Sequence, residues 1–450
     1  MASLPDSTVI ERSRVSPPPA TIGDKSLSLT FSDFLWLRHP PVHYLFFYEL
    51  SVTETQFVET FVPRLKHSLS TTLQYFYPFA GNLIVFPTPK PPEIRYVEGD
   101  SVEVTFTKSD LDFNELTGNH PRNCDKFYHL MPLLGEPTKT SNYLKIPLFS
   151  VQVTLFPHHG ISIGMTNHHS LGDASTRSFF LKAWTSIAKF GTDETFLANG
   201  TLPVYDRLVQ NPKLDENYLR FAKIQSLYDE YTTQSLSGPN NKLRAAFILT
   251  KNVIDELKRT VSTQLPTLSY VSSFTVTCAY IWSCIAKVRN DDESQIFGFA
   301  IDCRTRIIPP VPAAYFGNCL GGCMANEKTS LLKKEKQGFL EAAKLIGESL
   351  HKALAETGGI VTNMESLFDD FLTVPTIIGV AGTPKLKVYD MDFGWGDPKK
   401  VETISIDYSL SISMNACRES NQDLEIGISL LANEMEDFVR VFHDGLKTYV

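Results

Sequence analysis

The sequence lacks the segments that would place a chain in or across a membrane. No apolar run reaches the ~18 residues that a transmembrane helix needs. The first 20 residues include Asp6 and Glu11 and contain no apolar stretch of the kind found in signal peptides. We therefore expect a protein without a membrane span or signal peptide, located in the cytoplasm.

Long runs of basic residues are absent as well, and the formal net charge is −8. Because a nucleic-acid-binding surface needs clustered Lys and Arg, this balance argues against nucleic acid as a partner. It does not prevent a local basic pocket from holding an anionic ligand.

The seven cysteines include no C-x-x-C pair. Cys319 and Cys323 are four residues apart, but no second pair of metal ligands follows them. Their odd number and irregular spacing indicate free thiols in a reducing compartment rather than a disulfide framework or a zinc site. We expect no metal.

Strand and helix patterns are mixed along the whole chain, and no repeat recurs at a fixed period. Its 450 residues correspond to two or three domains of roughly 100–200 residues each. The predicted strands are 43–50, 101–107, 147–157, 160–169, 242–250, 295–306, 403–416 and 423–431. The predicted helices are 55–76, 173–189, 215–230, 272–288, 330–356 and 433–448.

A polar stretch with weak periodicity separates two halves of similar composition. We therefore expect an N-terminal domain over 1–195, a crossover over 196–240 and a C-terminal domain over 241–450. Part of 360–400 is expected to pack with the N-terminal domain. Two α+β halves with a ligand cleft between them is the predicted architecture.

The stretch "SIGMTNHHSLGDASTRSFF", from Ser162 to Phe180, changes from a strand to a helix at two histidines. Gly172 permits a sharp turn there, and Asp173 is then placed to cap the helix. His169 is left at a strand end as a candidate general base, because a neutral imidazole accepts a proton near neutral pH. The alternative is a core histidine bonded to a backbone carbonyl. For His168 we favour a structural role.

Two other chemistries fit the same stretch less well. "GISIG" matches the G-x-S-x-G pattern of serine hydrolases, but Ile161 and Ile163 favour an extended backbone where a nucleophile needs a tight turn. A metal site is disfavoured because neighbouring strand residues such as His168 and His169 point to opposite faces.

"DFGWG", from Asp392 to Gly396, is the second landmark. Gly394 and Gly396 permit unusual backbone angles, and Trp395 could wall a pocket; a purely structural turn is the alternative. The triplet DFG also occurs in protein kinases, but the other kinase motifs are missing here.

"HHSLGD" and "DFGWG", together with "YPFAGNL" over 77–83, resemble the plant BAHD acyl-CoA-dependent acyltransferases over essentially the whole chain. The resemblance implies a two-domain chloramphenicol-acetyltransferase-like fold with a channel between the domains. It also implies that His169 is the base and that Asp173 is structural and paired with an arginine. Asp392 would be structural too, bonded to Arg304 or Arg306.

"YFGNC", over 315–319, resembles the branch that acylates anthocyanins and other phenolic glucosides. Ala174 departs from the family pattern, which often has glycine after the aspartate. The implied reaction is direct acyl transfer from an acyl-CoA co-substrate, with no permanently bound cofactor. In it, His169 deprotonates a sugar hydroxyl, and the indole N–H of Trp395 is a candidate donor to the oxyanion.

Arg177 follows Asp173 by four residues and points to malonyl as the acyl group. Its planar guanidinium matches a carboxylate, whereas a coumaroyl slot would be apolar. The alternative for Arg177 is a solvent-facing side chain.

Contacts to the two substrates are predicted at scattered positions. Lys258, beside Arg259, is a candidate for the CoA phosphates unless the two form a solvated charged face. Ser273 and Thr275 are candidates for the pantetheine arm. Asp33 and Trp36, in "LTFSDFLWL", resemble the segment that lines the phenolic pocket in the family.

The sequence therefore predicts a monomeric malonyltransferase acting on a phenolic glucoside such as an anthocyanin. Two alternatives stay open: a hydroxycinnamoyl-CoA transferase on anthocyanin glucosides, and a non-catalytic family member that binds a small molecule or a partner protein.

Overall fold

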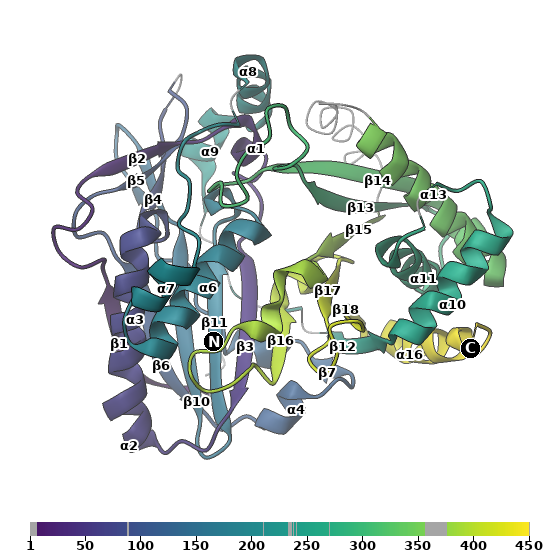
Figure 1. Ribbon diagram of the computed structural model, residues 1–450, viewed down its shortest axis with the longest axis horizontal. Coiled ribbons are helices and arrows are strands. Elements are labelled where there is room, and N and C mark those ends of the chain that lie inside the picture. Colours follow the sequence, from purple (N-terminus) through teal and green to yellow (C-terminus); the bar gives the residue numbers. More distant parts are fainter. Residues whose placement is uncertain are drawn as a thin grey trace.

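The computed structural model describes residues 7–87, 90–209, 211–232, 236, 238–239, 241–269, 271–355 and 376–449. Two α+β halves lie side by side, the N-terminal one at the left of Figure 1 and the C-terminal one at the right. The mixed α+β class predicted from the sequence is confirmed. Residues 360–375, for which packing with the first half was predicted, lie outside the described part.

The N-terminal half is built on a six-stranded sheet in which β6 and β10 are parallel and the other neighbours antiparallel. Its strands, in spatial order, are β1 (Ser7–Val15), β6 (Val102–Ser109), β10 (Phe149–Phe156), β11 (Gly160–Asn167), β3 (Val42–Glu49) and β16 (Lys400–Thr403). Every residue of β10 and β11 is buried, because side chains pack on both faces of the sheet centre. Their polar residues, such as Ser150, Gln152 and Thr154 of β10, are therefore buried together with the apolar ones.

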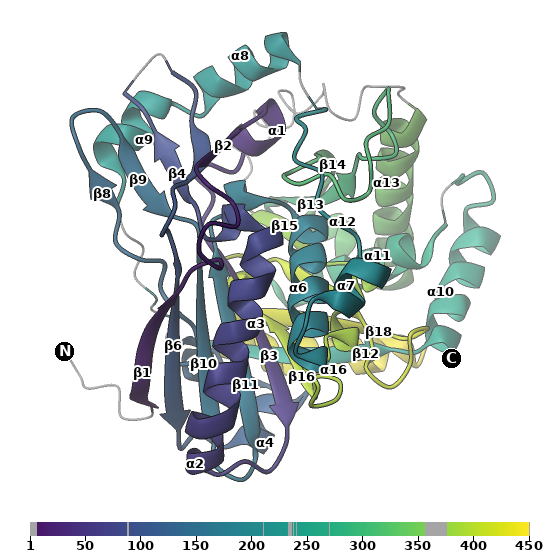
Figure 2. The ribbon, with the colours of Figure 1, turned by 60° about the vertical axis from the view of Figure 1, so that its left-hand side comes forward.

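Two long helices, α3 (Val62–Tyr75) and α6 (Ala174–Phe190), cover one face of this sheet side by side (Figure 2). A five-stranded sheet adjoins them. Its strands, in order, are β2 (Lys25–Ser28), β5 (Glu93–Tyr96), β4 (Asn82–Val85), β9 (Leu144–Pro147) and β8 (Thr138–Lys139). The shorter helices of this half are α1 (Phe31–Phe34), α2 (Glu54–Gln56), α4 (Phe113–Thr117), α5 (Asp125–Tyr128), α7 (Glu194–Asn199), α8 (Pro212–Phe221) and α9 (Ile224–Glu230).

The C-terminal half wraps a seven-stranded sheet with helices packed around α11 (Ser273–Val288), whose residues from Thr275 to Ala286 are all buried. The strands, in order, are β14 (Leu320–Lys328), β13 (Ser294–Asp302), β15 (Thr376–Ala381), β17 (Ile412–Ala416), β18 (Leu424–Leu431), β12 (Lys242–Leu249) and β7 (Arg122–Asn123). The other helices are α10 (Lys251–Gln264), α12 (Thr329–Leu332), α13 (Glu335–Ala355) and α16 (Ala432–Leu446).

The two halves exchange strands. β16, from the C-terminal part of the chain, pairs with β3 in the first sheet, and β7, from the N-terminal part, pairs with β12 in the second. Buried ion pairs join the exchanged segments: Glu402 contacts Arg122 at 2.8 Å and Arg244 at 3.0 Å. Burial alone would raise the pKa of Glu402, but these guanidinium groups outweigh it and lower the pKa to about 2. The halves are therefore fixed to each other through charged core contacts.

The predicted strand over 403–416 is wrong in its first part. β16 ends at Thr403, residues Ile404–Tyr408 form a 3-10 turn, and β17 begins only at Ile412. The break occurs because the chain passes from one sheet to the other here, where buried Asp407 pairs with Arg244 at 3.0 Å. The predicted helix over 215–230 is two helices, α8 and α9, since Lys223 between them has a φ of +48°.

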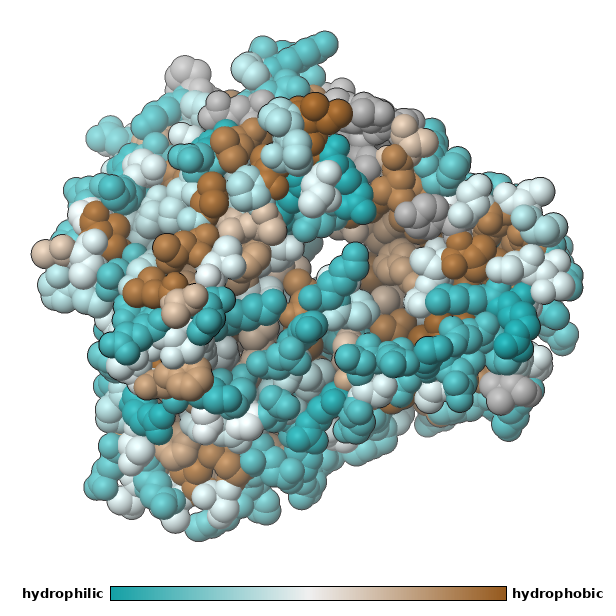
Figure 3. Space-filling model, viewed as in Figure 1, coloured by the Kyte–Doolittle hydropathy of each residue, from teal (hydrophilic) through white to brown (hydrophobic). Residues whose placement is uncertain are grey.

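The space-filling view shows an open passage between the two halves (Figure 3). Among the described helices, none is both long enough and apolar enough to cross a bilayer. The candidate catalytic residues His169 and Asp173 lie at the start of α6 (Ala174–Phe190), His169 in the turn His169–Leu171 that precedes the helix.

Candidate active site

A short 3-10 turn, His169–Leu171, presents His169 between the end of β11 and the start of α6. The turn forms because the His168 ring accepts a hydrogen bond from the backbone N–H of Ser170 at 3.3 Å. Gly172 follows with a φ of +154°, where a Cβ would lie 2.7 Å from the side chain of Thr176. His168 is thus structural in the contacts it makes, and Gly172 permits the turn that follows His169.

The imidazole of His169 is stacked on the indole of Trp36, with ring centres 3.9 Å apart and planes 11° apart. His39 approaches the same ring edge-on at 5.0 Å. Burial, reinforced by the nearby His39 and Arg177, lowers the pKa of His169 well below its ordinary value. The ring is therefore neutral at cytosolic pH, as a proton acceptor must be. Nδ1 of His169 and Nε1 of Trp36 are both buried without a hydrogen-bond partner.

Asp173 is buried, and both of its carboxylate oxygens are occupied. It caps α6 by accepting from the N–H of Thr176 at 3.1 Å. Arg304 donates two hydrogen bonds to the Asp173 carboxylate, at 2.7 and 3.0 Å. The backbone N–H of Cys319 donates one more at 3.1 Å. The predicted arginine partner of Asp173 is therefore Arg304. Because these contacts saturate the carboxylate, Asp173 positions the strand-to-helix join rather than facing a substrate.

The prediction that Asp392 bonds to Arg304 or Arg306 is wrong. Asp392 pairs with Lys189 at 2.7 Å and accepts three backbone N–H groups of its own loop, those of Gly394, Trp395 and Gly396. Gly394 and Gly396 have φ values of +94° and +92°, which non-glycine residues rarely adopt. "DFGWG" is thus a carboxylate-centred turn.

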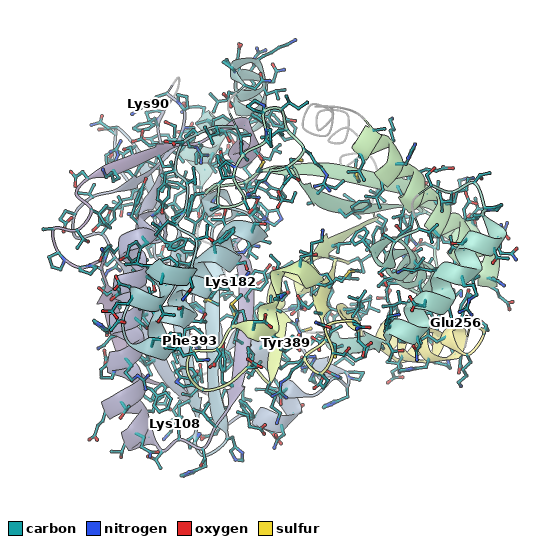
Figure 4. The ribbon with its side chains drawn as sticks, in the orientation of Figure 1. Lys90, Lys108, Lys182, Glu256, Tyr389 and Phe393 are labelled. Carbon is teal, nitrogen blue, oxygen red and sulfur yellow. The ribbon has the colours of Figure 1, made fainter. Side chains whose placement is uncertain are left out.

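The prediction that Trp395 donates to the oxyanion is also wrong. Its loop meets Lys189 in the last turn of α6, whereas His169 precedes the first turn. A 17-residue helix separates the two ends by about 25 Å at 1.5 Å per residue. In Figure 4, Phe393 accordingly lies beyond Lys182 along α6. The Trp395 ring packs against Tyr48 and Phe61.

Asp33, predicted to contact the acceptor, instead lies in the core with no exposed surface. It pairs with Arg207, accepts from the backbone and side-chain nitrogens of Asn318 at 2.9 and 3.0 Å, and caps α1 through Thr30. That prediction is wrong, because no oxygen of Asp33 is left for a substrate. Asn318 also donates to the backbone carbonyl of His169 at 3.1 Å. Asp33 therefore supports the site from behind.

Arg177 lies on the first turn of α6 and lines an apolar pocket. It donates to the carbonyl of Gly172 at 3.0 Å and to the hydroxyl of Tyr44 at 3.1 Å. No acidic side chain of the described residues pairs with it. The pocket is lined by Tyr44, Phe46, Phe79, Phe149, Met165, Asn167, Ala174, Arg177, Ser178, Phe180, Leu181, Leu386, Val388 and Met391. Arg177 is the one cation of this lining.

A family model described as the Transferase family matches residues 7–444. The chain belongs to the Transferase family. This is the family of BAHD acyltransferases that the sequence motifs resemble. Among curated relatives, a malonyl-coenzyme A:anthocyanin 3-O-glucoside-6''-O-malonyltransferase of Dahlia pinnata is 50% identical and matches all of both chains. The phenolic glucoside malonyltransferase 1 of Nicotiana tabacum is 41% identical over 91% of this chain and 92% of its own.

Solved structures of the Transferase-family fold agree with this assignment. Vinorine synthase aligns with a TM-score of 0.69 at 18% identity, covering 97% of this chain and 98% of its own. F. sporotrichioides TRI101, complexed with coenzyme A and T-2, has a TM-score of 0.62 at 16% identity, covering 91% and 96%. These likenesses show the fold, and the two-domain α+β acyltransferase architecture predicted from the sequence is confirmed.

The residues predicted to contact CoA in this family member are spread over the second half. Lys258 lies on α10, the helix whose Glu256 is labelled at the outer edge of the molecule in Figure 4. Ser273 opens α11 and is partly exposed. Thr275 is fully buried and its hydroxyl is bonded to Ser272 at 2.9 Å, so the prediction that it touches the pantetheine arm is wrong. Lys258 and Ser273 stay predictions.

Sequence reasoning missed three residues that contact His169 or Arg177. His39 and Tyr44 carry no motif, and their place beside His169 and Arg177 depends on strand pairing between β3 and β11. Asn318 stands inside "YFGNC" and could have been found there, since that motif was linked to the family. No group of three or more His, Cys, Asp or Glu side chains among the described residues could hold a metal ion.

Proposed function

We propose that this protein transfers a malonyl group from malonyl-CoA to a sugar hydroxyl of a phenolic glucoside, with His169 as general base. The observation that carries the proposal is the cation at Arg177, which stands one helical turn from the His169 turn without an acidic partner among the described residues. The buried arginines Arg304 and Arg244, by contrast, are paired with carboxylates. An unpaired guanidinium at the site favours a substrate that brings its own carboxylate.

The proposed reaction needs one proton acceptor and no bound cofactor. Neutral His169 takes the proton of the sugar hydroxyl while its oxygen attacks the thioester carbonyl carbon. The tetrahedral intermediate then collapses as the carbon–sulfur bond breaks, and the imidazolium returns the proton to the CoA thiolate. In malonyl-CoA the carboxylate carbon lies two bonds from the reacting thioester carbon. A cation that binds this carboxylate must therefore stand near the base. Arg177 is proposed to be this cation, since its Nη1 donates at 3.0 Å to the carbonyl of Gly172, three residues after His169.

Several remaining roles complete the proposal. Trp36, face-on to the base, is proposed to line the acceptor side, where its ring can also stack with a phenolic aglycone. Lys258 and Ser273 are proposed contacts of CoA. We further propose a monomer in the cytoplasm. The reducing compartment is supported by seven cysteines that are all unpaired and buried.

Incubation with malonyl-CoA and an anthocyanin 3-O-glucoside, followed by mass spectrometry, tests the proposal. We expect a mass gain of one malonyl unit that is lost in His169→Ala and retained in His129→Ala, a control histidine that lies outside the site. If product forms with coumaroyl-CoA but not with malonyl-CoA, the protein is instead a hydroxycinnamoyl transferase. A relative described as coumaroyl-CoA:anthocyanidin 3-O-glucoside-6''-O-coumaroyltransferase 1, from Arabidopsis thaliana, is 33% identical to this chain. Glucoside binding without turnover of any acyl-CoA would assign a non-catalytic binder.

A further inference from the structure

The side chain of Arg177 is held by a partner from a distant part of the chain. Tyr44 lies on β3, opposite Met165 of β11, on the side of the sheet that faces α6. Its hydroxyl accepts a hydrogen bond from Nη2 of Arg177 at 3.1 Å. Its ring lies beneath the same guanidinium, with the guanidinium carbon 5.1 Å from the ring centre. Tyr44 therefore contacts Arg177 both at the edge and at the face of its ring.

A second contact fixes the other end of the guanidinium fork. Nη1 of Arg177 donates to the carbonyl of Gly172 at 3.0 Å. Arginine has five N–H donors, and these two contacts use only two of them. The group is thus fixed in orientation while most of its donors are left for a ligand.

The pocket beside Arg177 is lined mostly by apolar side chains, and Arg177 is part of its partly exposed rim. The buried lining includes Phe46, Phe79, Phe149 and Phe180 with the polar Asn167 and Ser178, and the partly exposed lining includes Tyr44 and Arg177 with Ala174, Leu181 and Leu386. A carboxylate placed among the phenylalanine rings would lose its hydrogen bonds to water and gain none from the protein. A negatively charged acyl group is therefore kept at the rim, where the guanidinium lies.

We propose that Tyr44 is a positioning residue that fixes Arg177 at the rim of this pocket and thereby makes the protein select a carboxylate-bearing acyl donor. The inference rests on the proposed malonyl transfer and adds to it a determinant of donor choice. Without the Tyr44 hydroxyl, the long side chain of Arg177 samples several rotamers. Part of the free energy of donor binding is then used to order that side chain. The effect falls on donors that use Arg177 and not on neutral ones.

Tyr44→Phe tests this with malonyl-CoA and acetyl-CoA, which differ by the carboxylate. Loss of one hydrogen bond to a charged group predicts about a 10-fold rise in KM for malonyl-CoA. We expect kcat to stay unchanged and both constants for acetyl-CoA to stay at the wild-type level. Tyr228→Phe, a tyrosine on α9 whose hydroxyl bonds to the carbonyl of Thr140, is the matched control and should change nothing. An unaltered malonyl-CoA KM in Tyr44→Phe, or an equal rise for both donors, overturns the inference.

A double-mutant cycle separates positioning from direct contact. In an Arg177→Ala background, Tyr44→Phe should have no further effect on malonyl-CoA, because there is no guanidinium left to hold. Additive losses would show that Tyr44 acts independently of Arg177 and would overturn the positioning role. The same four proteins are titrated calorimetrically with malonyl-CoA and with acetyl-CoA, in the absence of acceptor. A wild-type protein without malonyl preference refutes the proposed function itself, whereas a wild-type preference that Tyr44→Phe leaves intact refutes only the role of Tyr44.

Discussion

Arg304 and Asp173, 131 residues apart in the chain, meet in a fork-to-fork ion pair in which both partners are almost completely buried. The pair joins the second half of the molecule to the first turn of α6, next to the base. Nη2 of Arg304 also donates to the carbonyls of Tyr315 and Gly317 at 3.1 Å each. A single guanidinium thus connects "HHSLGD" with "YFGNC".

Arg304→Met is expected to destabilise the protein strongly, because it leaves the Asp173 carboxylate buried without its cation. Removal of one partner of a buried ion pair costs about 3–5 kcal/mol. Urea denaturation followed by circular dichroism measures the loss. Arg306→Met is the control, since Arg306 is exposed and bonds only to a backbone carbonyl. Equal stability of the two variants would contradict a supporting role for the pair.

Trp395→Phe is expected to leave kcat unchanged, since the ring lies at the far end of α6 from His169. Loss of a genuine oxyanion donor would lower kcat about 100-fold. Steady-state kinetics with malonyl-CoA and a saturating glucoside measures the difference. A large fall in kcat with an unaltered melting temperature would show that Trp395 reaches the reacting atoms and would contradict the assignment made from its packing.

Arg177→Met is expected to move donor preference from malonyl to butyryl. The substitution removes the cation and adds an apolar side chain to a pocket that is already apolar. Two lost charge-assisted hydrogen bonds correspond to about a 100-fold fall in kcat/KM with malonyl-CoA. Competition between the two donors, quantified by mass spectrometry, gives the ratio directly. Arg220→Met, a change at an exposed side chain of α8, is the control. An equal fall with both donors would mean that Arg177 serves the fold rather than donor choice.

The acid limb of kcat/KM is expected below pH 6.5. Because burial lowers the pKa of His169 beneath that ordinary value, the imidazole stays neutral and able to accept a proton until the pH falls further. Activity is therefore retained near pH 6.5 and lost as the pH drops through the lowered value. A pH series of initial rates at low donor concentration tests this. An acid limb above pH 6.5 would show that the base is not the buried ring described here.

Stability is expected to fall between pH 7 and pH 5, in part through His43. This ring is buried against Thr166, and desolvation lowers its pKa to about 4. The unfolded chain then binds a proton that the folded chain does not, so one such group costs about 2 kcal/mol of stability over this range. Urea denaturation at both pH values, for wild type and His43→Asn, measures the difference. The variant should lose less stability than wild type on acidification, and an identical loss would exclude His43 as the cause.

The sequence predicted the elements around the site because their patterns are local. β10 and β11 largely alternate apolar with polar or small residues on either side of a turn, and α6 begins at a capping aspartate, so these elements can be located without tertiary information. The position of His169 between them follows from the same signals. This is why the base was the residue most directly accessible to sequence reasoning.

Pairings across the molecule could not be predicted in the same way. Trp36 and His169 are separated by more than a hundred residues, and their stacking depends on where α1 docks on the 3-10 turn. Asp33 was predicted to line the acceptor pocket because "LTFSDFLWL" resembles the segment that does so in the family, yet Asn318 and Arg207 enclose it. The prediction for Trp395 failed because the motif "DFGWG" does not show which end of α6 its loop packs against. In each case a tertiary contact decided the role.

The exchange of strands between the halves has a consequence for synthesis of the chain. β3 is complete after 49 residues, but the strand that covers its outer edge, β16, is not made until residue 403. During translation of the intervening segment, the backbone N–H and C=O groups along that edge are unpaired and offer a template for another chain. That edge of β3 therefore stays open to pairing with another chain until β16 itself has left the ribosome.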